Sequence, residues 1–199
     1  MAKFEVCCHK FADLSEHNYG VSIINDSKYG FSTAGKAMRL SLLRSSKAPD
    51  GNADMGSHRI RWAIMPHQGG LGASTVRAAF NFNSPLKLLA GKPLSLARQP
   101  LKLTGDDNLV LDWIKRGEND EEVSLDALPK NKERSIVVRV YDALGGLGRG
   151  RIAAAYAIDK VFKTNILEDN LEEVPVQNDE FEIEVGPFEV ATYRLVLKE

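Results

Sequence analysis

Residues 180–185 have the sequence Glu180-Phe181-Glu182-Ile183-Glu184-Val185, in which acidic and apolar side chains alternate without exception. Successive side chains of a β-strand point to opposite faces of its sheet, so this alternation predicts a strand with one polar and one apolar face. Antiparallel sheets commonly have one face on the core and the other in water. The stretch therefore predicts an antiparallel sheet that packs on a core through its apolar face.

Further strands are predicted along the chain, because short apolar or alternating segments are separated by turn residues. These segments cover residues 4–8, 19–25, 36–43, 59–65, 108–114, 135–141, 152–158 and 187–197. The pairs Gly145-Gly146 and Gly186-Pro187 supply turns between strands. Several short strands at this spacing favour a mostly β fold with an antiparallel β-sandwich architecture.

One short helix is expected between two β regions, near residues 74–82, because apolar side chains recur there at helical spacing. Pro85 would end it. The glycine-rich run that begins at His67 is the clearest internal boundary. We expect residues 1–68 to form the end of a central β-sandwich region, residues 69–94 a connector with the helix, and residues 95–199 a C-terminal β-sandwich domain.

The composition is that of an ordinary globular protein, with 43% hydrophobic and 27% charged residues. Lys and Arg total 26 against 27 Asp and Glu, a balance that argues against nucleic acid or an anionic membrane surface as the main partner. No run of 18 apolar residues is present, so no membrane-spanning segment is expected. The acidic stretches at residues 117–122 and 168–173 are interpreted as solvated loops.

The two cysteines are the neighbours Cys7 and Cys8. A bridge between adjacent cysteines is strained, so a reduced, intracellular setting is expected. The first residues also lack the apolar core of a secretory signal. We therefore expect a chain that is not secreted.

No catalytic centre or metal site is apparent from the residues alone. The four histidines are scattered, without the spacing of zinc ligands. The glycine-rich residues 145–150 precede a strand pattern instead of a helix, so they are interpreted as a β-turn and not as a phosphate loop. Glycoside hydrolysis could use two carboxylates, but composition cannot select a pair. The residues thus predict a β scaffold with no catalytic residue and no metal ligand.

The opening residues suggest no reaction, but their order along the chain is informative. Residues 4–16 read Phe-Glu-Val-Cys-Cys-His-Lys-Phe-Ala-Asp-Leu-Ser-Glu, residues 25–30 read Asn-Asp-Ser-Lys-Tyr-Gly, and residues 40–45 read Leu-Ser-Leu-Leu-Arg-Ser. These strings resemble glycoside hydrolase family 38 α-mannosidases, most closely the cytosolic or vacuolar branch. Weaker similarities at residues 138–143 and 187–195 follow in the family's order, so the resemblance covers nearly the whole chain.

The resemblance implies a retaining, exo-acting α-mannosidase that hydrolyses terminal α-mannose from oligosaccharides. It also implies that the catalytic barrel, with zinc or another divalent metal, lies N-terminal to this segment. The chain would then be the non-catalytic C-terminal β portion, without a cofactor and inactive alone. Its expected partners are the barrel and a mannose-containing oligosaccharide, with no nucleic acid and no membrane. Its expected location is the cytoplasm, with delivery to the vacuole as a second option.

The same resemblance suggests a substrate-binding site, because an arginine near a strand end can line the sugar pocket in this family. Arg44 has the matching position and would donate a hydrogen bond to a mannose hydroxyl. Asp26 and Tyr29 could lie beside it, since a carboxylate accepts from hydroxyls and an aromatic ring covers an apolar sugar face. In the alternative interpretation, Arg44 pairs with a nearby acid and Asp26 caps its own turn.

Two other functions stay open. The chain could be a stand-alone carbohydrate-binding β-sandwich, which would need an exposed aromatic platform. Trp62 and Trp113 both lie within apolar strand patterns, which argues against such a platform. The chain could also be an oligomerisation domain that forms a homo-oligomer, and a solution mass well above that of one chain would favour this function.

Overall fold

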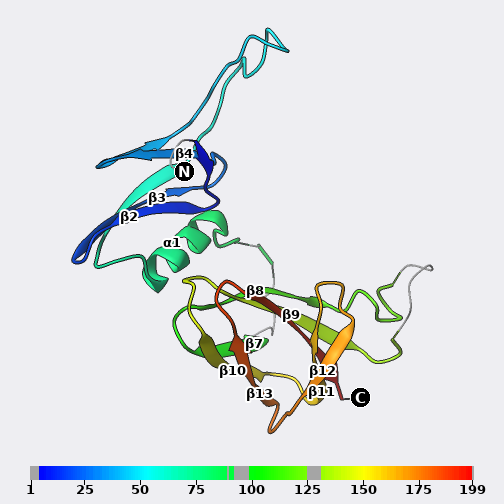
Figure 1. Cartoon of the computed structure of the whole chain (residues 1–199). Helices are drawn as coiled ribbons and strands as arrows, with labels where there is room; N and C mark the ends of the chain where they lie inside the picture. Colours follow the sequence, from blue (N-terminus) through cyan, green and yellow to red (C-terminus); the bar gives the residue numbers. More distant parts are fainter. Residues whose placement is uncertain (1–4, 89, 92–98, 125–130, 199) are drawn as a thin grey trace. The chain divides into compact units, whose positions relative to one another are not determined.

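The computed structural model describes residues 5–88, 90–91, 99–124 and 131–198. The chain divides into two compact units, unit 1 (residues 1–90) and unit 2 (residues 91–199). Strands dominate both units, and the described residues contain one helix (Figure 1). No helix in the described ranges is long and apolar enough to cross a bilayer. The predicted mostly β fold with one short helix is confirmed, whereas the finer three-part division stays a prediction.

Unit 1 contains two three-stranded antiparallel sheets and the helix. Its elements are β1 (Val6–Cys7), β2 (Phe11–Ser15), β3 (Tyr19–Asn25), β4 (Gly30–Ala34), β5 (Ala37–Leu40), β6 (Trp62–Gln68) and α1 (Ala73–Asn83). One sheet has the order β1-β4-β5 and the other the order β2-β3-β6. α1 packs against β3 and β2, and it buries Thr75, Val76 and Ala79. The helix therefore covers one face of the β2-β3-β6 sheet.

Unit 2 is a β-sandwich of one three-stranded and one five-stranded sheet. Its elements are β7 (Leu101–Gly105), β8 (Leu109–Arg116), β9 (Ser135–Asp142), β10 (Gly148–Ala154), β11 (Ile158–Thr164), β12 (Asn170–Val174), β13 (Glu180–Val185) and β14 (Val190–Leu197). The sheet orders are β13-β10-β7 and β12-β11-β14-β9-β8. The core lies between the two sheets, where Ile152 and Phe181 of one sheet belong to the same buried cluster as Val140 and Leu195 of the other.

β13 has the two faces that its sequence predicts. Its three apolar side chains are at most 4% exposed. Its glutamates lie on the solvent side and pair with arginines of the neighbouring strand β10. Arg149 Nε lies 2.9 Å from Glu184 Oε2, and Arg151 Nη2 lies 3.1 Å from Glu182 Oε1. Cross-strand pairs of opposite charge stabilise the polar face of the sheet modestly.

One predicted strand is two strands in the structure. The expected strand at residues 152–158 is divided, because β10 ends at Ala154 and β11 begins at Ile158. β10 belongs to the three-stranded sheet and β11 to the five-stranded sheet. The chain crosses between the layers at this point, and the apolar residues on both sides of the crossing conceal the break in the sequence pattern.

β8 contains a bulge that changes the side of the sheet on which Trp113 lies. Leu111 is opposite Val140 and Trp113 is opposite Arg139, so β8 has one residue more than β9 between these pairs. An extra residue inverts the alternation of faces beyond it. Trp113 is consequently 62% exposed, and Trp62 is 49% exposed. The sequence argument against an exposed aromatic platform is therefore wrong.

The interpretation of the acidic stretches as solvated loops is wrong for two of their carboxylates. Asp120 is 1% exposed and Glu168 is 5% exposed. The Ser135 backbone N–H donates to Asp120 at 2.6 Å, and Arg194 Nε donates to the Ser135 hydroxyl at 3.0 Å. Lys115 Nζ lies 2.5 Å from Glu168 Oε1. Partners that are distant in sequence thus hold both acids inside the unit.

Candidate functional site

The structure places Asp26, one of the predicted sugar-contacting residues, at the end of β3 in unit 1. Its carboxylate lies 3.6 Å from Arg61 Nε and accepts a hydrogen bond from the Ser27 hydroxyl at 3.0 Å. The Arg61 guanidinium also lies over the Phe82 ring, 4.7 Å from its centroid. Arg61 therefore adds a cation beside Asp26, and local sequence reasoning missed this arginine.

Tyr29 forms an aromatic pair at the surface of unit 1. Its ring stacks on His9 with a centroid separation of 4.4 Å and an interplanar angle of 9°. Tyr29 is 42% exposed, so part of its ring is open to water. A flat aromatic surface of this kind can contact the apolar face of a sugar ring. Nothing in the local sequence predicted the partnership with His9.

Arg44 lies in residues 41–61, which extend away from the two sheets of unit 1 (Figure 1). This extension is braced by the Ser45 N–H, which donates to Asp54 Oδ2 at 3.0 Å. Arg44 is exposed. Within residues 5–88, no hydrogen bond or ion pair joins Arg44 to Asp26 or Tyr29. The structure thus gives each of the three residues a position, and their joint role in sugar binding stays a prediction.

A buried polar cluster lies between the β2-β3-β6 sheet and α1. His67 Nε2 lies 2.6 Å from Asp13 Oδ2, and the Ser22 hydroxyl donates to the same oxygen at 2.6 Å. Burial raises the pKa of Asp13, but the hydrogen bonds from Ser22 and His67 outweigh it and hold this pKa below its ordinary value. Ser22 contacts Asp13 and Thr75, so the histidine is not placed to take its proton. The cluster joins the sheet to the helix and lacks the geometry of a hydrolytic triad.

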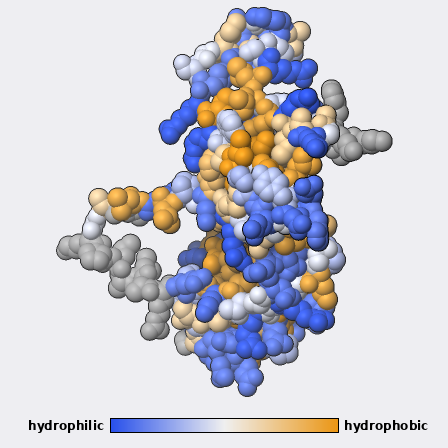
Figure 2. All heavy atoms as spheres, turned by 90° about the vertical axis from the view of Figure 1, so that its left-hand side faces the viewer, coloured by the Kyte–Doolittle hydropathy of each residue, from blue (hydrophilic) through white to orange (hydrophobic). Residues whose placement is uncertain are grey.

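The second face of the β2-β3-β6 sheet carries apolar side chains that we call the open apolar face. It consists of Leu14, Tyr19, Val21, Ile23, Trp62 and Ile64. Ile64 is 58% exposed and Tyr19 is 52% exposed. A cavity of about 550 Å³ lies between this face and the β4–β5 hairpin, where Met38 contributes to the lining. Apolar side chains gather at the surface of unit 1 in the space-filling view (Figure 2).

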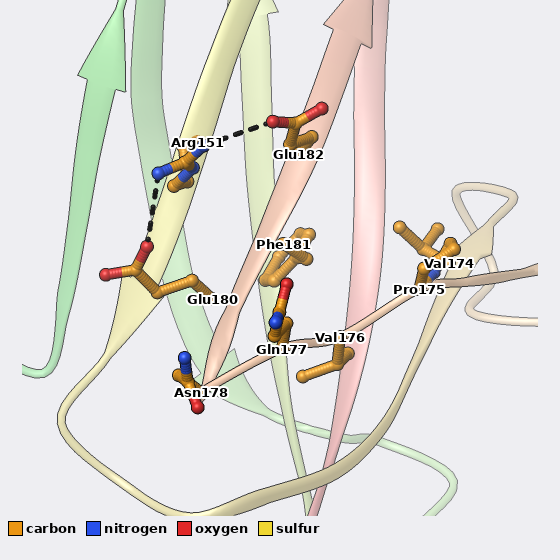
Figure 3. Close-up of a pocket in the computed structure, with 9 residues that line it drawn as sticks. All are labelled: Arg151, Val174, Pro175, Val176, Gln177, Asn178, Glu180, Phe181 and Glu182. Atoms are coloured by element: carbon orange, nitrogen blue, oxygen red, sulfur yellow. Dashed lines mark hydrogen bonds and ion pairs between the residues drawn. The ribbon is translucent and has the colours of Figure 1, made fainter.

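A cavity of about 660 Å³ opens beside β13 in unit 2 (Figure 3). Arg151 lies at one wall and pairs with Glu180 at 3.5 Å and with Glu182 at 3.1 Å. Gln177 and Asn178 offer amide groups nearer the loop (Figure 3). One arginine against two glutamates leaves a net charge of −1, and the arginine is already paired with both acids, so it is not free to bind an anionic ligand.

Two family models match the chain. Residues 1–52 match the glycosyl hydrolases family 38 C-terminal domain, and residues 108–193 match the glycosyl hydrolases family 38 C-terminal beta sandwich domain. The chain belongs to the C-terminal region of glycosyl hydrolase family 38. The resemblance found in the sequence is therefore confirmed.

Relatives of this family 38 chain are similar over almost its whole length. It is 45% identical over 98% of its residues to a Saccharomyces cerevisiae protein named alpha-mannosidase. It is 36% identical over 98% to alpha-mannosidase G of Dictyostelium discoideum, and 32% identical over 99% to human alpha-mannosidase 2C1. These matches cover 19%, 18% and 18% of the three relatives. The chain thus spans less than a fifth of the length of the curated relatives it matches.

A solved structure supports the fold assignment. The crystal structure of an alpha-mannosidase from Enterococcus faecalis superposes with a TM-score of 0.68 at 15% identity. The match covers 96% of this family 38 chain and 21% of the bacterial protein. At this identity the likeness shows that the two chains share a fold.

The family resemblance places the implied metal in the catalytic barrel, and the residues described here do not form a second site that fits it. Among them, no group of three or more His, Cys, Asp or Glu side chains is arranged to hold a metal ion. His67, for example, is bonded to Asp13 inside unit 1. A tetrahedral or larger site needs three or four converging ligands. No step of a reaction is therefore assigned to a metal held by these residues.

Proposed function

We propose that this family 38 chain is the non-catalytic C-terminal β portion of an α-mannosidase that hydrolyses terminal α-mannose from oligosaccharides. Within that enzyme it packs on the catalytic barrel and helps to line the sugar pocket. The proposal is supported by identities of 32–45% over nearly the whole chain to much longer proteins named alpha-mannosidase. In this proposal the catalytic part holds zinc or another divalent metal. The enzyme works in the cytoplasm or, after delivery, in the vacuole.

The open apolar face of unit 1 is the observation that carries the packing role. Soluble monomers rarely expose large contiguous apolar patches, and such patches usually mark contact surfaces. α1 covers the opposite face of the same sheet, whereas the β4–β5 hairpin borders the open apolar face without burying Tyr19, Trp62 or Ile64. A second layer on the open side would remove Tyr19, Trp62 and Ile64 from water. The rest of the α-mannosidase polypeptide is the partner that the proposal names.

On its own, the chain is expected to release no product from an aryl α-mannoside, with or without added zinc. A retaining mechanism needs two carboxylates about 5 Å apart on opposite sides of a bound sugar. The measurement is the absorbance of the aryl group released by the purified chain. Co-expression with the remainder of the S. cerevisiae relative is expected to restore turnover. Zinc-dependent turnover by the chain alone, after controls for contaminants, would overturn the non-catalytic assignment.

One substitution in each unit distinguishes the loss of packing on the catalytic barrel from a general loss of folding. Ile64→Glu places a carboxylate on the open apolar face and is expected to lower the restored activity about tenfold, because a buried unpaired charge is costly. Tyr156→Glu is the matched control, since Tyr156 is 46% exposed in unit 2. Equal reconstitution by both variants would show that the open apolar face is not the contact surface.

Arg44 is expected to act on substrate binding in the reconstituted enzyme. Arg44→Met removes its hydrogen-bond donors and should raise KM for a mannoside about tenfold, the effect of one lost charge-assisted bond, with a smaller change in kcat. Arg39→Met is the matched control on the nearby strand β5, where Arg39 is also exposed. Steady-state kinetics on both variants decide the question. An unchanged KM in Arg44→Met would remove Arg44 from the sugar pocket.

A further inference from the structure

The outer face of the five-stranded sheet in unit 2 carries an exposed tryptophan next to a polar cavity. Trp113 lies opposite Arg139 of β9, so their side chains stand on one face with Cβ atoms about 5 Å apart. Lys115 follows Trp113 by two residues and shares this face. Arg139 and Lys115 line a cavity of about 550 Å³. We call Trp113 and this cavity the outer-face site.

The cavity is lined by polar groups of both kinds. Besides the two cations it has three carboxylates and the side-chain amides of Asn119, Asn131 and Asn170. Each amide offers both donors and an acceptor, the carboxylates accept, and the cations donate. Two positive and three negative charges nearly cancel, so neither a strong anion nor a strong cation is the natural ligand. Sugar hydroxyls, which both donate and accept, match this lining.

Several of these groups are held in place before any ligand arrives. Lys115 forms ion pairs with Glu118 and Glu168, and the Glu168 side chain is 3% exposed. The Glu118 backbone N–H donates to Glu168 Oε2 at 2.8 Å. Arg139 Nε donates to the Thr192 hydroxyl at 3.3 Å. Because these side chains are already ordered, a ligand would lose less free energy to their immobilisation.

Apolar surfaces flank the polar lining. Ile166 and Leu167 are 68% and 73% exposed at the cavity, and Trp113 is 62% exposed. The C–H faces of pyranose rings pack on such surfaces, above all on flat aromatic rings. We propose that the outer-face site binds a neutral oligosaccharide, with the Trp113 indole against one sugar ring and the polar lining around the hydroxyls of a neighbouring ring. The preference for mannose-containing oligosaccharides rests on the function proposed above.

A protein partner is the main competitor for this surface, because the rest of a larger enzyme could cover Trp113. Cores of protein interfaces are depleted of charged residues. Here the tryptophan instead adjoins a cavity with five charged side chains and three amides. This composition favours a polyhydroxylated small ligand over an apolar protein surface.

The test uses the fact that the chain has only two tryptophans. Trp62→Phe leaves Trp113 as the single tryptophan, whose emission is followed during titration of the full chain with an α-linked manno-oligosaccharide. A saturable change is expected. Arg139→Met in this background should weaken binding about tenfold, the effect of a lost charge-assisted hydrogen bond. Arg151→Met, in the cavity of Figure 3, is the matched control and should bind as the background does.

Leu167→Ala gives an independent measurement, since its side chain is largely exposed and its loss should leave the fold intact. It should weaken binding a few-fold, as seen by calorimetry and by saturation-transfer NMR on the sugar. No saturable signal, or binding that is unchanged in both Arg139→Met and Leu167→Ala, would overturn the outer-face site and leave the surface to a protein partner. Equal binding of maltose would overturn the mannose preference alone. The co-expression assay tests the proposed function separately. Failure of the outer-face site can therefore be distinguished from failure of the proposed function.

Discussion

Asp120→Ala is expected to destabilise unit 2 by about 3–5 kcal/mol, because it leaves a buried cation without its partner. The Ser135 hydroxyl donates to Asp120 Oδ1 at 2.7 Å and accepts from Arg194 Nε. Arg194 Nη2 lies 3.6 Å from Asp120 Oδ1, and the two side chains are 4% and 1% exposed. Without the carboxylate, this guanidinium keeps only the exposed Glu133, whose Oε2 lies 3.8 Å from Arg194 Nη2, as an ion-pair partner among the described residues. Urea unfolding at neutral pH, followed by Trp113 emission in the Trp62→Phe background, measures the loss.

A double variant separates the charge effect from the loss of packing. Asp120→Ala combined with Arg194→Met removes both charges and should be less destabilised than Asp120→Ala alone, since the unpaired cation causes most of the damage. If the double variant is as unstable as the single variant or more so, the ion pair is not the reason for the effect. Glu182→Ala, on the exposed face of β13, should change stability by less than about 0.5 kcal/mol.

Asp142→Ala is expected to destabilise unit 2 by about 3 kcal/mol, since it removes a buried carboxylate that accepts several hydrogen bonds and leaves their donors unpaired. Asp142 is 2% exposed at the end of β9. It accepts hydrogen bonds from Asn108 Nδ2 at 2.7 Å, from the Gly145 N–H at 2.7 Å and from the Phe188 N–H at 2.8 Å. These bonds tie the β9–β10 turn to the β13–β14 turn. Urea unfolding of Asp142→Ala, with Asp106→Ala as an exposed control, checks the magnitude.

The same residue gives unit 2 part of its dependence on pH. Burial raises the pKa of Asp142, but hydrogen bonds from Phe188, Asn108, Leu144 and Gly145 outweigh it, so the pKa is lowered in the folded state. A carboxyl with a depressed folded pKa stabilises the fold above its unfolded pKa, near 4, and this contribution is lost as pH falls through the folded value. Asp142→Asn should therefore lose less stability than the parent chain below about pH 4. If the free energies of unfolding of Asp142→Asn and of the parent chain fell equally with pH in the acid range, Asp142 would not be the source of this pH dependence.

The sequence predicted those parts of the fold that depend on local periodicity. The alternation at residues 180–185 identified the buried and exposed faces of β13, and the helical spacing at residues 74–82 identified α1. The division of residues 152–158 could not be predicted, because the chain changes sheets within an apolar run. The burial of Asp120 was also hidden, since its partners Ser135 and Arg194 come from other strands.

The candidate site was less accessible to sequence reasoning than the fold. Family resemblance singled out Asp26, Tyr29 and Arg44, but only the tertiary structure shows that Arg61 pairs with Asp26 and that His9 stacks on Tyr29. The outer-face site was missed for a different reason. Its tryptophan lies in a stretch that looks like a buried strand, and the bulge that exposes it leaves no mark in the hydrophobic pattern.

The extra residue in β8 has an evolutionary consequence. β8 lies at the border of its sheet, where a change in strand length disturbs a single neighbour. Insertion or deletion of one residue there would move every following side chain of β8 to the opposite face of the sheet. The strand up to Leu111 would keep its packing. An insertion or deletion in β8 would therefore add or remove a surface aromatic side chain without any substitution in the core up to Leu111.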